Sequence, residues 1–245
     1  CHSPPRWFYD LYHDRKNSFF GRLARPAVRY LRTRDSAIDD RVDYYLANSP
    51  VIARRLWKFY KRDAEVVYPP VELGRYENQG DEGFYFHLGR LDVEKGIKAI
   101  VEAFEGLDKQ IVFAGGEGDA GVVDRIQAAD NMEYAGFVSE DEKYDLLGGC
   151  RAVVFNGRNE DFGIVPIEAN ASGKPCLARN NGFPGLFVEA GQNGFLHDGS
   201  VASIRAAVNR LEAEGVATDP TSFIDPFSMA AFEDRLRATV AETAQ

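Results

Sequence analysis

The stretch AVVFNGRNEDFGIVPIEANASGKP, residues 152–175, decides the fold of this chain. Its opening residues are mostly apolar and β-branched, which predicts a short buried strand. Pro166 suits the first position of a helix, so a helix is predicted to begin there and to end near Gly173. Glu160 stands in the turn between the two elements, and Glu168 falls in the first predicted helical turn. A strand that leads through a turn into a helix is the unit of parallel α/β sheets.

The same alternation continues on both sides of this stretch. Short apolar strands are predicted at 84–90, 110–116, 132–137, 152–157, 174–180 and 194–198. Amphipathic helices are predicted between them, at 95–106, 120–129, 140–148, 166–173 and 201–214. This pattern predicts an α/β domain with a doubly wound, Rossmann-like parallel sheet that is covered on both faces. Ligands of such sheets bind beyond the carboxyl ends of the strands.

Composition limits the classes of protein to which the chain can belong. The 245 residues are 44% hydrophobic and carry a formal net charge of −9, which argues against a nucleic-acid binder. Three cysteines, an odd number without a CxxC pair, suggest a reducing compartment. We therefore expect a cytoplasmic protein.

Two cations follow the strand predicted at 84–90. Gly89 and Arg90 come just past the strand, and Lys95 stands at the start of the next helix. A helix start with an Arg and a Lys beside it can bind an anion such as a pyrophosphate. A solvated loop with two surface cations is the other interpretation of these residues.

The turn at 161–165 predicts a second anion-favouring site that faces the first. It offers free backbone N–H groups at a helix start. Glu160 and Glu168 can flank one ligand there, and carboxylates accept paired hydrogen bonds from the vicinal hydroxyls of sugar and ribose rings. Alternatively, Glu168 only complements the helix dipole and Glu160 is a surface acid.

The stretch AGGEGDAG at 114–121 formally matches GxGxxG, the pattern of dinucleotide-binding loops. Glu117 and Asp119 would point carboxylates at the dinucleotide phosphate, so we favour a tight loop around a ligand's base. An NAD-dependent oxidoreductase also needs an acid at the end of the following strand. Neither Glu133 nor Glu140 is well placed for that role, which makes this alternative the weaker one.

Two motifs together resemble a known family. EDFGIVPIEANASGKP at 160–175 and GRLDVEKG at 89–96 resemble the donor-binding domain of the retaining GT-B glycosyltransferases of family 4, the group 1 glycosyltransferases. The resemblance covers residues 80–200, and within the family it is most similar to mannosyltransferases that use GDP-mannose. CHSPPRWFYDLY, RVDYYLANS and VVYPPVE resemble the later part of the family's amino-terminal domain and its crossover.

The resemblance implies a GT-B type fold in three segments. Residues 1–75 would be part of the acceptor-side domain with the crossover, 76–222 the nucleotide-sugar donor domain, and 223–245 a final helix that crosses back. The apolar face of that helix, which includes Phe227, would then lack much of its partner. Because a complete doubly wound domain needs roughly 100–150 residues, we expect a partial amino-terminal domain and little transfer by this chain alone. A split enzyme completed by a separate chain is the alternative.

The family's pattern also implies roles for particular residues. Arg90 and Lys95 would bind the donor pyrophosphate, Glu160 the transferred sugar, and Glu168 the ribose hydroxyls. The implied catalytic residues are Glu160, Arg90, Lys95 and His2, and the implied donor-binding residues are Gly89, Arg90, Lys95, Phe162, Gly163, Ile164, Val165 and Glu168. In NNGFPGLF, Asn181 and Gly185 replace the family's Gly and Glu. This departure leaves the sugar or acceptor preference open.

The resemblance implies a reaction that moves a hexose from a nucleotide-diphosphate sugar to a glycan or lipid-linked acceptor with retained configuration. Because the most similar members are mannosyltransferases, the hexose is expected to be mannose. Arg90, Lys95 and a helix start could neutralise the departing pyrophosphate. There is no Asp-x-Asp triplet, so we expect no metal and no cofactor besides the donor substrate, GDP-mannose by resemblance. A non-catalytic nucleotide-sugar sensor is the alternative, although it would not need Glu160 or His2.

Residues 15–34, RKNSFFGRLARPAVRYLRTR, hold seven basic residues and no acid. With Phe19, Phe20 and Leu23 interleaved, the segment suits peripheral docking on an anionic inner membrane face, where a lipid-linked acceptor would lie. Alternatively, it is a helix whose arginines pair with acids of the other domain.

Overall fold

The chain forms two compact units in the computed structural model, which describes residues 1–6, 9 and 23–243. Unit 1 comprises Cys1–Pro69 together with Phe232–Gln245, and unit 2 comprises Pro70–Ala231. Each unit is described below by itself.

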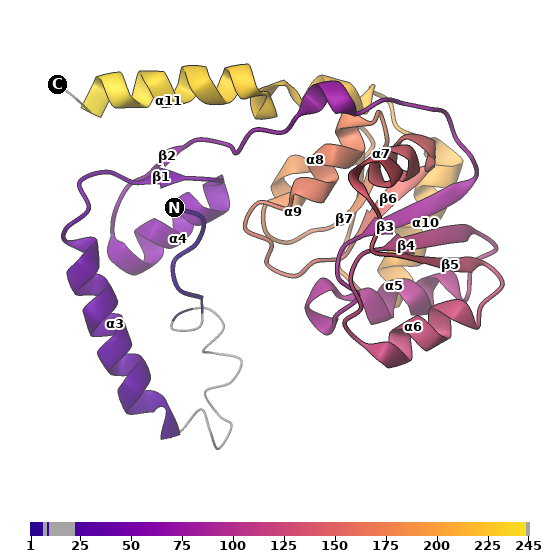
Figure 1. The fold of residues 1–245 in the computed structure, drawn as a ribbon, viewed down its shortest axis with the longest axis horizontal. Coiled ribbons are helices and arrows are strands. Elements are labelled where there is room, and N and C mark those ends of the chain that lie inside the picture. Colours follow the sequence, from indigo (N-terminus) through magenta and orange to yellow (C-terminus); the bar gives the residue numbers. More distant parts are fainter. Residues whose placement is uncertain (7–8, 10–22, 244–245) are drawn as a thin grey trace. The chain divides into compact units, whose positions relative to one another are not determined.

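Unit 2 is built around a six-stranded parallel sheet in the order β5-β4-β3-β6-β7-β8 (Figure 1). The strands are β3 Phe84–Leu88, β4 Gln110–Ala114, β5 Met132–Gly136, β6 Ala152–Phe155, β7 Cys176–Arg179 and β8 Gly194–His197. All six strands and the doubly wound α/β class are confirmed. Each strand ends earlier than predicted, because the glycine and polar residues at its carboxyl end already belong to the loop that leaves the sheet.

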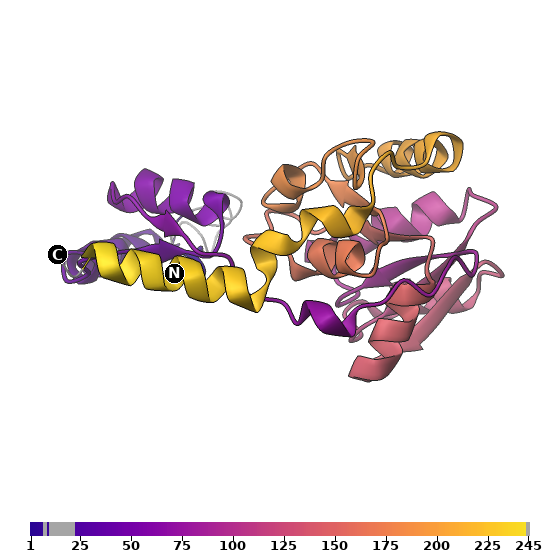
Figure 2. The same ribbon diagram turned by 90° about the horizontal axis from the view of Figure 1, so that it is seen from above.

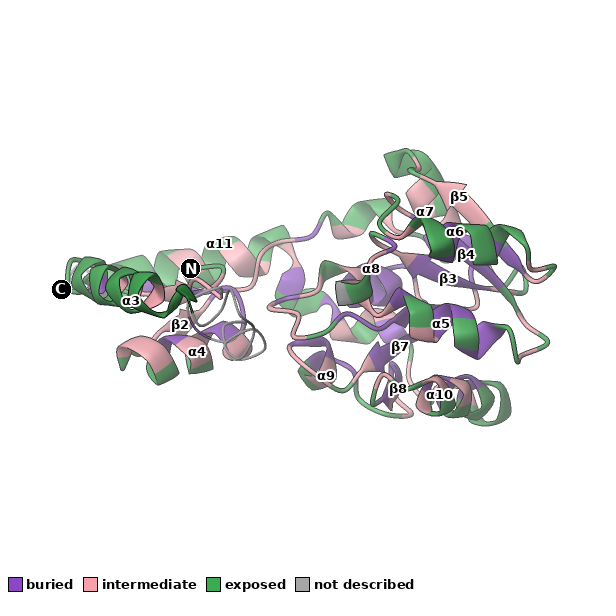
Figure 3. Ribbon diagram, turned by 90° about the horizontal axis from the view of Figure 1, so that it is seen from below, coloured by how far each residue is buried: buried purple, intermediate pink, exposed green. Residues whose placement is uncertain are grey.

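Helices cover both faces of this sheet (Figure 2). One face carries α5 Ile97–Phe104, α6 Ala120–Gln127 and α10 Val201–Glu214, and the other carries α7 Glu140–Gly149, α8 Ile164–Ala171 and α9 Pro184–Phe187. Four short 3-10 helices complete the unit: η1 Leu73–Arg75, η2 Val93–Lys95, η3 Pro220–Phe223 and η4 Asp225–Phe227. Strands β3, β4, β6, β7 and β8 are largely buried, whereas the edge strand β5 is mostly intermediate. The outer sides of α5, α6 and α10 are exposed, so the core lies between sheet and helices (Figure 3).

Helix α8 begins at Ile164, two residues before the predicted start, so the placement of Pro166 at the first helical position is wrong. Gly163 adopts a left-handed φ of 68°, and this turns the chain directly into the helix. Pro166 is tolerated as the third residue because N–H groups of the first helical turn have no intrahelical acceptor. Glu168 therefore lies in the second turn.

Unit 1 contains α3 Arg25–Asp39, β1 Leu46–Ala47, α4 Pro50–Tyr60 and β2 Glu65–Val66, and most of α11 Met229–Thr243 belongs to it. Strand β1 is only two residues long, and it pairs in parallel with β2. Ala47, Ile52 and Leu56 form a small buried core. Arg235 of α11 pairs with Glu65, which ties the carboxy-terminal helix to this unit.

The expectation that Phe227 lacks a partner is wrong. Phe227 lies in η4, before α11, and is 3% exposed within unit 2. Its ring centroid is 5.9 Å from that of Phe162, 6.1 Å from that of Phe183 and 5.5 Å from that of Phe187. The final helix starts only at Met229, after the turn at Ser228, so the phenyl ring faces the core of unit 2.

Replacement of Phe227 by alanine should lower the free energy of unfolding of unit 2 by about 3–5 kcal/mol, because it leaves a cavity among three aromatic rings. Urea unfolding of the full chain would measure the loss. Leu186→Ala is the control, since Leu186 is 46% exposed and should cost roughly 1 kcal/mol or less. Equal losses in both variants would contradict the packing described for Phe227.

Candidate functional site

The loop after β3 carries the two predicted cations. Gly89 follows the strand, and the exposed Arg90 side chain places its Nη2 3.2 Å from Oδ2 of Asp92. Asp92 also caps η2, since its Oδ1 accepts a hydrogen bond of 2.9 Å from the backbone N–H of Lys95. Both cations thus stand at the carboxyl end of the central strand, and Asp92 fixes the backbone that carries Lys95.

Lys95 and Glu160 contact each other directly, because Nζ of Lys95 donates to Oε1 of Glu160. Their side chains are 28% and 21% exposed, so the ion pair is largely shielded from solvent. The glutamate side chain lies against Gly157 at the end of β6, where an added Cβ would come within 2.7 Å of Oε1. The structure thereby brings together the loops that follow β3 and β6.

The backbone of Glu160 is held by the loop that follows β7. Asn159 has a left-handed φ of 54°, and its N–H donates to Oδ1 of Asn181 over 2.5 Å. The carbonyl of Glu160 accepts a hydrogen bond of 3.0 Å from the N–H of Phe183. A Cβ on Gly182 would lie 2.3 Å from that carbonyl oxygen, so only glycine permits this approach. Asn181, a departure from the family's pattern, therefore helps to position Glu160.

The turn at the start of α8 is anchored by aromatic packing. The rings of Phe162 and Phe183 stack with centroids 5.3 Å apart. Gly163 has no side chain to cap the helix, so the N–H groups of Ile164 and Val165 at the helix start are available to an anion.

Glu168 is 5% exposed and has two side-chain donors. Its Oε1 accepts hydrogen bonds from the Tyr76 hydroxyl, at 2.8 Å, and from Nζ of Lys143, at 3.2 Å. Two causes raise the pKa of Tyr76 far above its usual range: burial, which is the larger, and the nearby Glu168 carboxylate. The phenol therefore remains a neutral donor. As Glu168 lies beyond the first turn of α8, pairing with the helix dipole does not explain it.

Tyr76 and Lys143 were not identified from the sequence. Tyr76 stands at the boundary predicted between the first two segments, and Lys143 lies in the charged helix α7, where a solvated lysine is the ordinary expectation. Burial alone would lower the pKa of Lys143, but its bonds to Glu140 and Glu168 outweigh that effect and raise it. Only the fold brings these three segments together.

The glycine-rich loop at 114–121 closes on itself. Oδ1 of Asp119 accepts a hydrogen bond of 3.1 Å from the N–H of Gly121 and caps α6, while Oδ2 lies 2.8 Å from Nζ of Lys98. The carboxylate occupies the helix start at which a dinucleotide pyrophosphate would bind. This geometry disfavours the NAD-dependent alternative.

A buried histidine of β3 lies near Lys95. His87 is 1% exposed, and its Nδ1 lies 2.9 Å from the carbonyl oxygen of Val154. Burial lowers the pKa of His87 to about 4. Beside it, Nδ2 of Asn156 donates to the carbonyl of Gly96 at 2.9 Å, which attaches the start of α5 to β6. His87 is therefore neutral near pH 7, and Asn156 links the loops that follow β3 and β6.

The other predicted features lie elsewhere or outside the described residues. His2 is exposed in unit 1. Phe19 and Phe20 of the basic segment lie outside the described residues, whereas Leu23 lies within them. Across residues 1–6, 9 and 23–243, no helix is long and apolar enough to cross a membrane.

The fold defines the class to which the chain belongs. Unit 2 has the doubly wound architecture of the GT-B glycosyltransferases, as its overlay on solved structures of that class shows. Residues 73–222 match the family model described as Glycosyl transferases group 1, and the chain belongs to this family. Membership goes against the oxidoreductase alternative.

Particular relatives are similar over much of the chain. Alpha-1,3/1,6-mannosyltransferase ALG2 of Mus musculus is 24% identical over an alignment 279 residues long. The alignment covers 96% of this chain and 65% of the mouse protein. The chain therefore spans less than two thirds of the length of that relative. Sucrose-phosphate synthase from Thermosynechococcus elongatus overlays with a TM-score of 0.75 at 18% identity, over 86% of this chain and 61% of its own. Anabaena HepE in complex with UDP-glucose overlays with a TM-score of 0.72 at 19% identity, over 86% and 67%.

The buried His87 should make stability depend on pH. Because its pKa falls from 6.5 to about 4 on folding, the unfolded chain binds the proton more tightly, and the free energy of unfolding should decrease as the pH drops below about 6.5. Between pH 7 and 5 the contribution of His87 to this loss should be about 2 kcal/mol. Urea unfolding of wild type and His87→Gln across this range tests it, since the variant should lack this part of the slope. An identical dependence of the free energy of unfolding on pH in the two proteins would contradict this role of His87.

Proposed function

We propose that the protein is a retaining hexosyltransferase that moves mannose from GDP-mannose to a glycan or lipid-linked acceptor. The observation that carries this proposal is the contact between Lys95 and Glu160, which joins the loops after β3 and β6 just before the start of α8. Ligands of doubly wound sheets bind in a crevice at these strand ends, where the residues offer cations to a pyrophosphate and a carboxylate to sugar hydroxyls. Mannose is supported by the name of the mouse relative, and GDP by resemblance to mannosyltransferases.

The proposed chemistry follows from where charge develops. When the bond between the sugar and the pyrophosphate breaks, negative charge grows on the departing phosphate oxygens. Arg90, Lys95 and the N–H groups at the start of α8 would stabilise that charge without a divalent ion. Glu160 would hold the sugar and Glu168 the ribose hydroxyls, and the family's pattern also implies a catalytic role for His2.

Calorimetric titration of the full chain with GDP-mannose, GDP, UDP-glucose, UDP and ADP tests the donor class. GDP and GDP-mannose should bind more tightly than the other nucleotides. Preference for UDP or ADP would overturn the choice of donor, and no binding of any of these nucleotides would overturn the proposed function.

Arg90→Ala and Lys95→Ala should each weaken GDP binding by about 1.5–3 kcal/mol, the size of a charge-assisted hydrogen bond. The fold should survive, since neither side chain belongs to the hydrophobic core of unit 2. Arg210→Ala is the matched control, because Arg210 forms a surface pair with Glu214 on α10, away from the crevice. Unchanged GDP affinity in both site variants would remove the pyrophosphate assignment.

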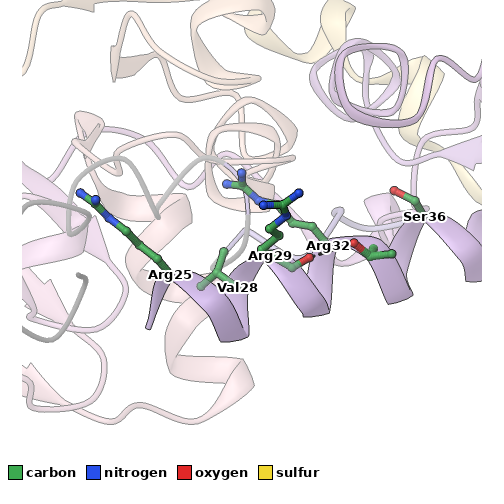
Figure 4. Close-up of a pocket in the computed structure, with 6 residues that line it drawn as sticks. Arg25, Val28, Arg29, Arg32 and Ser36 are labelled. Atoms are coloured by element: carbon green, nitrogen blue, oxygen red, sulfur yellow. Dashed lines mark hydrogen bonds between the residues drawn. The ribbon is translucent and has the colours of Figure 1, made fainter. Parts of the chain in front are cut away.

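A membrane surface is the proposed location of the acceptor. Arg25, Arg29 and Arg32 extend from one side of α3 and line a shallow pocket on it (Figure 4). Their spacing of four and three residues places them on one helical face. Tyr30 and Ile38 of the same helix are 61% and 57% exposed. A helix with cations and exposed apolar side chains fits peripheral binding to anionic lipid.

Liposome sedimentation at low and high salt measures this binding. Anionic vesicles should bind the full chain at low salt and release it at high salt, and Arg25→Gln with Arg29→Gln should reduce the bound fraction severalfold, since each cation contributes about 1 kcal/mol near the surface. The matched control, Arg54→Gln with Arg237→Gln, removes the same charge from exposed positions of α4 and α11. Equal binding by both variants, or none by wild type at low salt, would refute membrane docking.

A further inference from the structure

The donor site is already occupied by an internal ion pair. We propose that the Lys95–Glu160 pair makes the site select the intact sugar nucleotide over the bare nucleoside diphosphate. This inference rests on the proposed function and assigns the pair a role in specificity beyond the separate roles of its two residues. The carboxylate competes with phosphate for the lysine, and only a ligand that satisfies both partners relieves the competition.

Both ends of the pair are anchored through their backbones. Lys95 is held by the cap from Asp92, and Gly96 follows it in a left-handed conformation with φ 66°. Glu160 is clamped by the N–H of Phe183 and by the close approach of Gly182. The partners can therefore separate by side-chain rotation, while the two backbones stay in place.

Shielding distinguishes this pair from the other one in the crevice. The side chains of Lys95 and Glu160 are 28% and 21% exposed, whereas that of Arg90 in the Arg90–Asp92 pair is 67% exposed. Exposed pairs contribute little because water and salt screen them, and shielded pairs interact more strongly. Drawing Lys95 away from its partner to bind a phosphate consequently costs more free energy than drawing Arg90 away from Asp92.

The cost of separating Lys95 from Glu160 is offset only by a ligand that gives Glu160 new hydrogen-bond donors. A bare diphosphate that draws Lys95 away leaves the Glu160 carboxylate without its cation and close to a second anion, which is unfavourable. A sugar nucleotide brings hydroxyl groups that donate to the carboxylate at the same time as its phosphate engages the lysine. After transfer, the remaining diphosphate lacks those hydroxyls, and reformation of the pair promotes its release.

Calorimetric titration of the full chain with GDP and GDP-mannose tests the proposal. Glu160→Gln removes the competing charge, so its affinity for GDP should rise by roughly fivefold, while its preference for GDP-mannose over GDP should fall by at least that factor. The matched control, Glu214→Gln, removes one negative charge from the surface of α10 and should change neither affinity.

A double-mutant cycle separates the pair from general repulsion of phosphate by Glu160. In a Lys95→Ala background, Glu160→Gln should raise GDP affinity by a clearly smaller factor than in the wild type, since no lysine remains to be released and only the repulsion between Glu160 and the phosphate is relieved. An equal or larger gain in that background, or a GDP affinity that is unchanged or lower in Glu160→Gln itself, would overturn the role of the pair while leaving the proposed function intact. Absence of binding of both ligands to wild type would instead overturn the proposed function.

Discussion

Parallel pairing of β3 with β6 in the middle of the sheet is the constraint on which the site depends. Tyr85 lies opposite Ala152, and Phe86 lies opposite Val153. After β3 the chain leaves towards α5 on one face, and after β6 it leaves towards α8 on the other. Loops that diverge from adjacent strands open a crevice between them. Lys95 and Glu160, 65 residues apart in sequence, meet only because these two strands are neighbours.

Each charged side chain predicted to bind the donor already has a partner within unit 2. Arg90 pairs with Asp92 and Lys95 with Glu160, while Glu168 accepts from a hydroxyl and an ammonium group. A shielded charge without a partner would cost several kcal/mol, so the fold requires such internal pairing. Under the proposed function, ligand binding at this crevice would accordingly be an exchange of partners, and its selectivity would depend on which internal contacts a ligand can replace.

The sequence predicts this fold better than it predicts the site. Strands and helices alternate with strong periodicity, because the burial of a parallel sheet on both faces demands apolar runs, and all six strands appear where expected. Element ends were less predictable. The start of α8 depends on the left-handed conformation of Gly163, and the position of Phe227 depends on aromatic rings from the turn before α8 and from α9 with its N-cap. Such contacts between distant segments have no periodic signal in the chain.

Asn181 is a residue next to the site whose role the sequence could not predict. At the level of sequence it is only a departure from the family's pattern, with consequences for sugar or acceptor preference. In the structure its side-chain oxygen accepts the N–H of Asn159 and supports a backbone conformation that is unfavourable for most residues other than glycine. A substitution that looks like a loss of the family's glycine therefore contributes a hydrogen bond that holds the turn before Glu160.

One strand-turn-helix unit, residues 152–175, places its two glutamate carboxylates in different environments. Glu168 is buried on the second turn of α8 and held by Tyr76 and Lys143, so its carboxylate has a fixed direction. Glu160 lies in the turn itself, where its backbone is clamped but its carboxylate faces a single lysine across the crevice. Their separation of eight residues cannot distinguish these environments, because burial and partners come from other strands. A rigid carboxylate suits a constant contact such as ribose, and an exchangeable one suits the part of the ligand that is transferred.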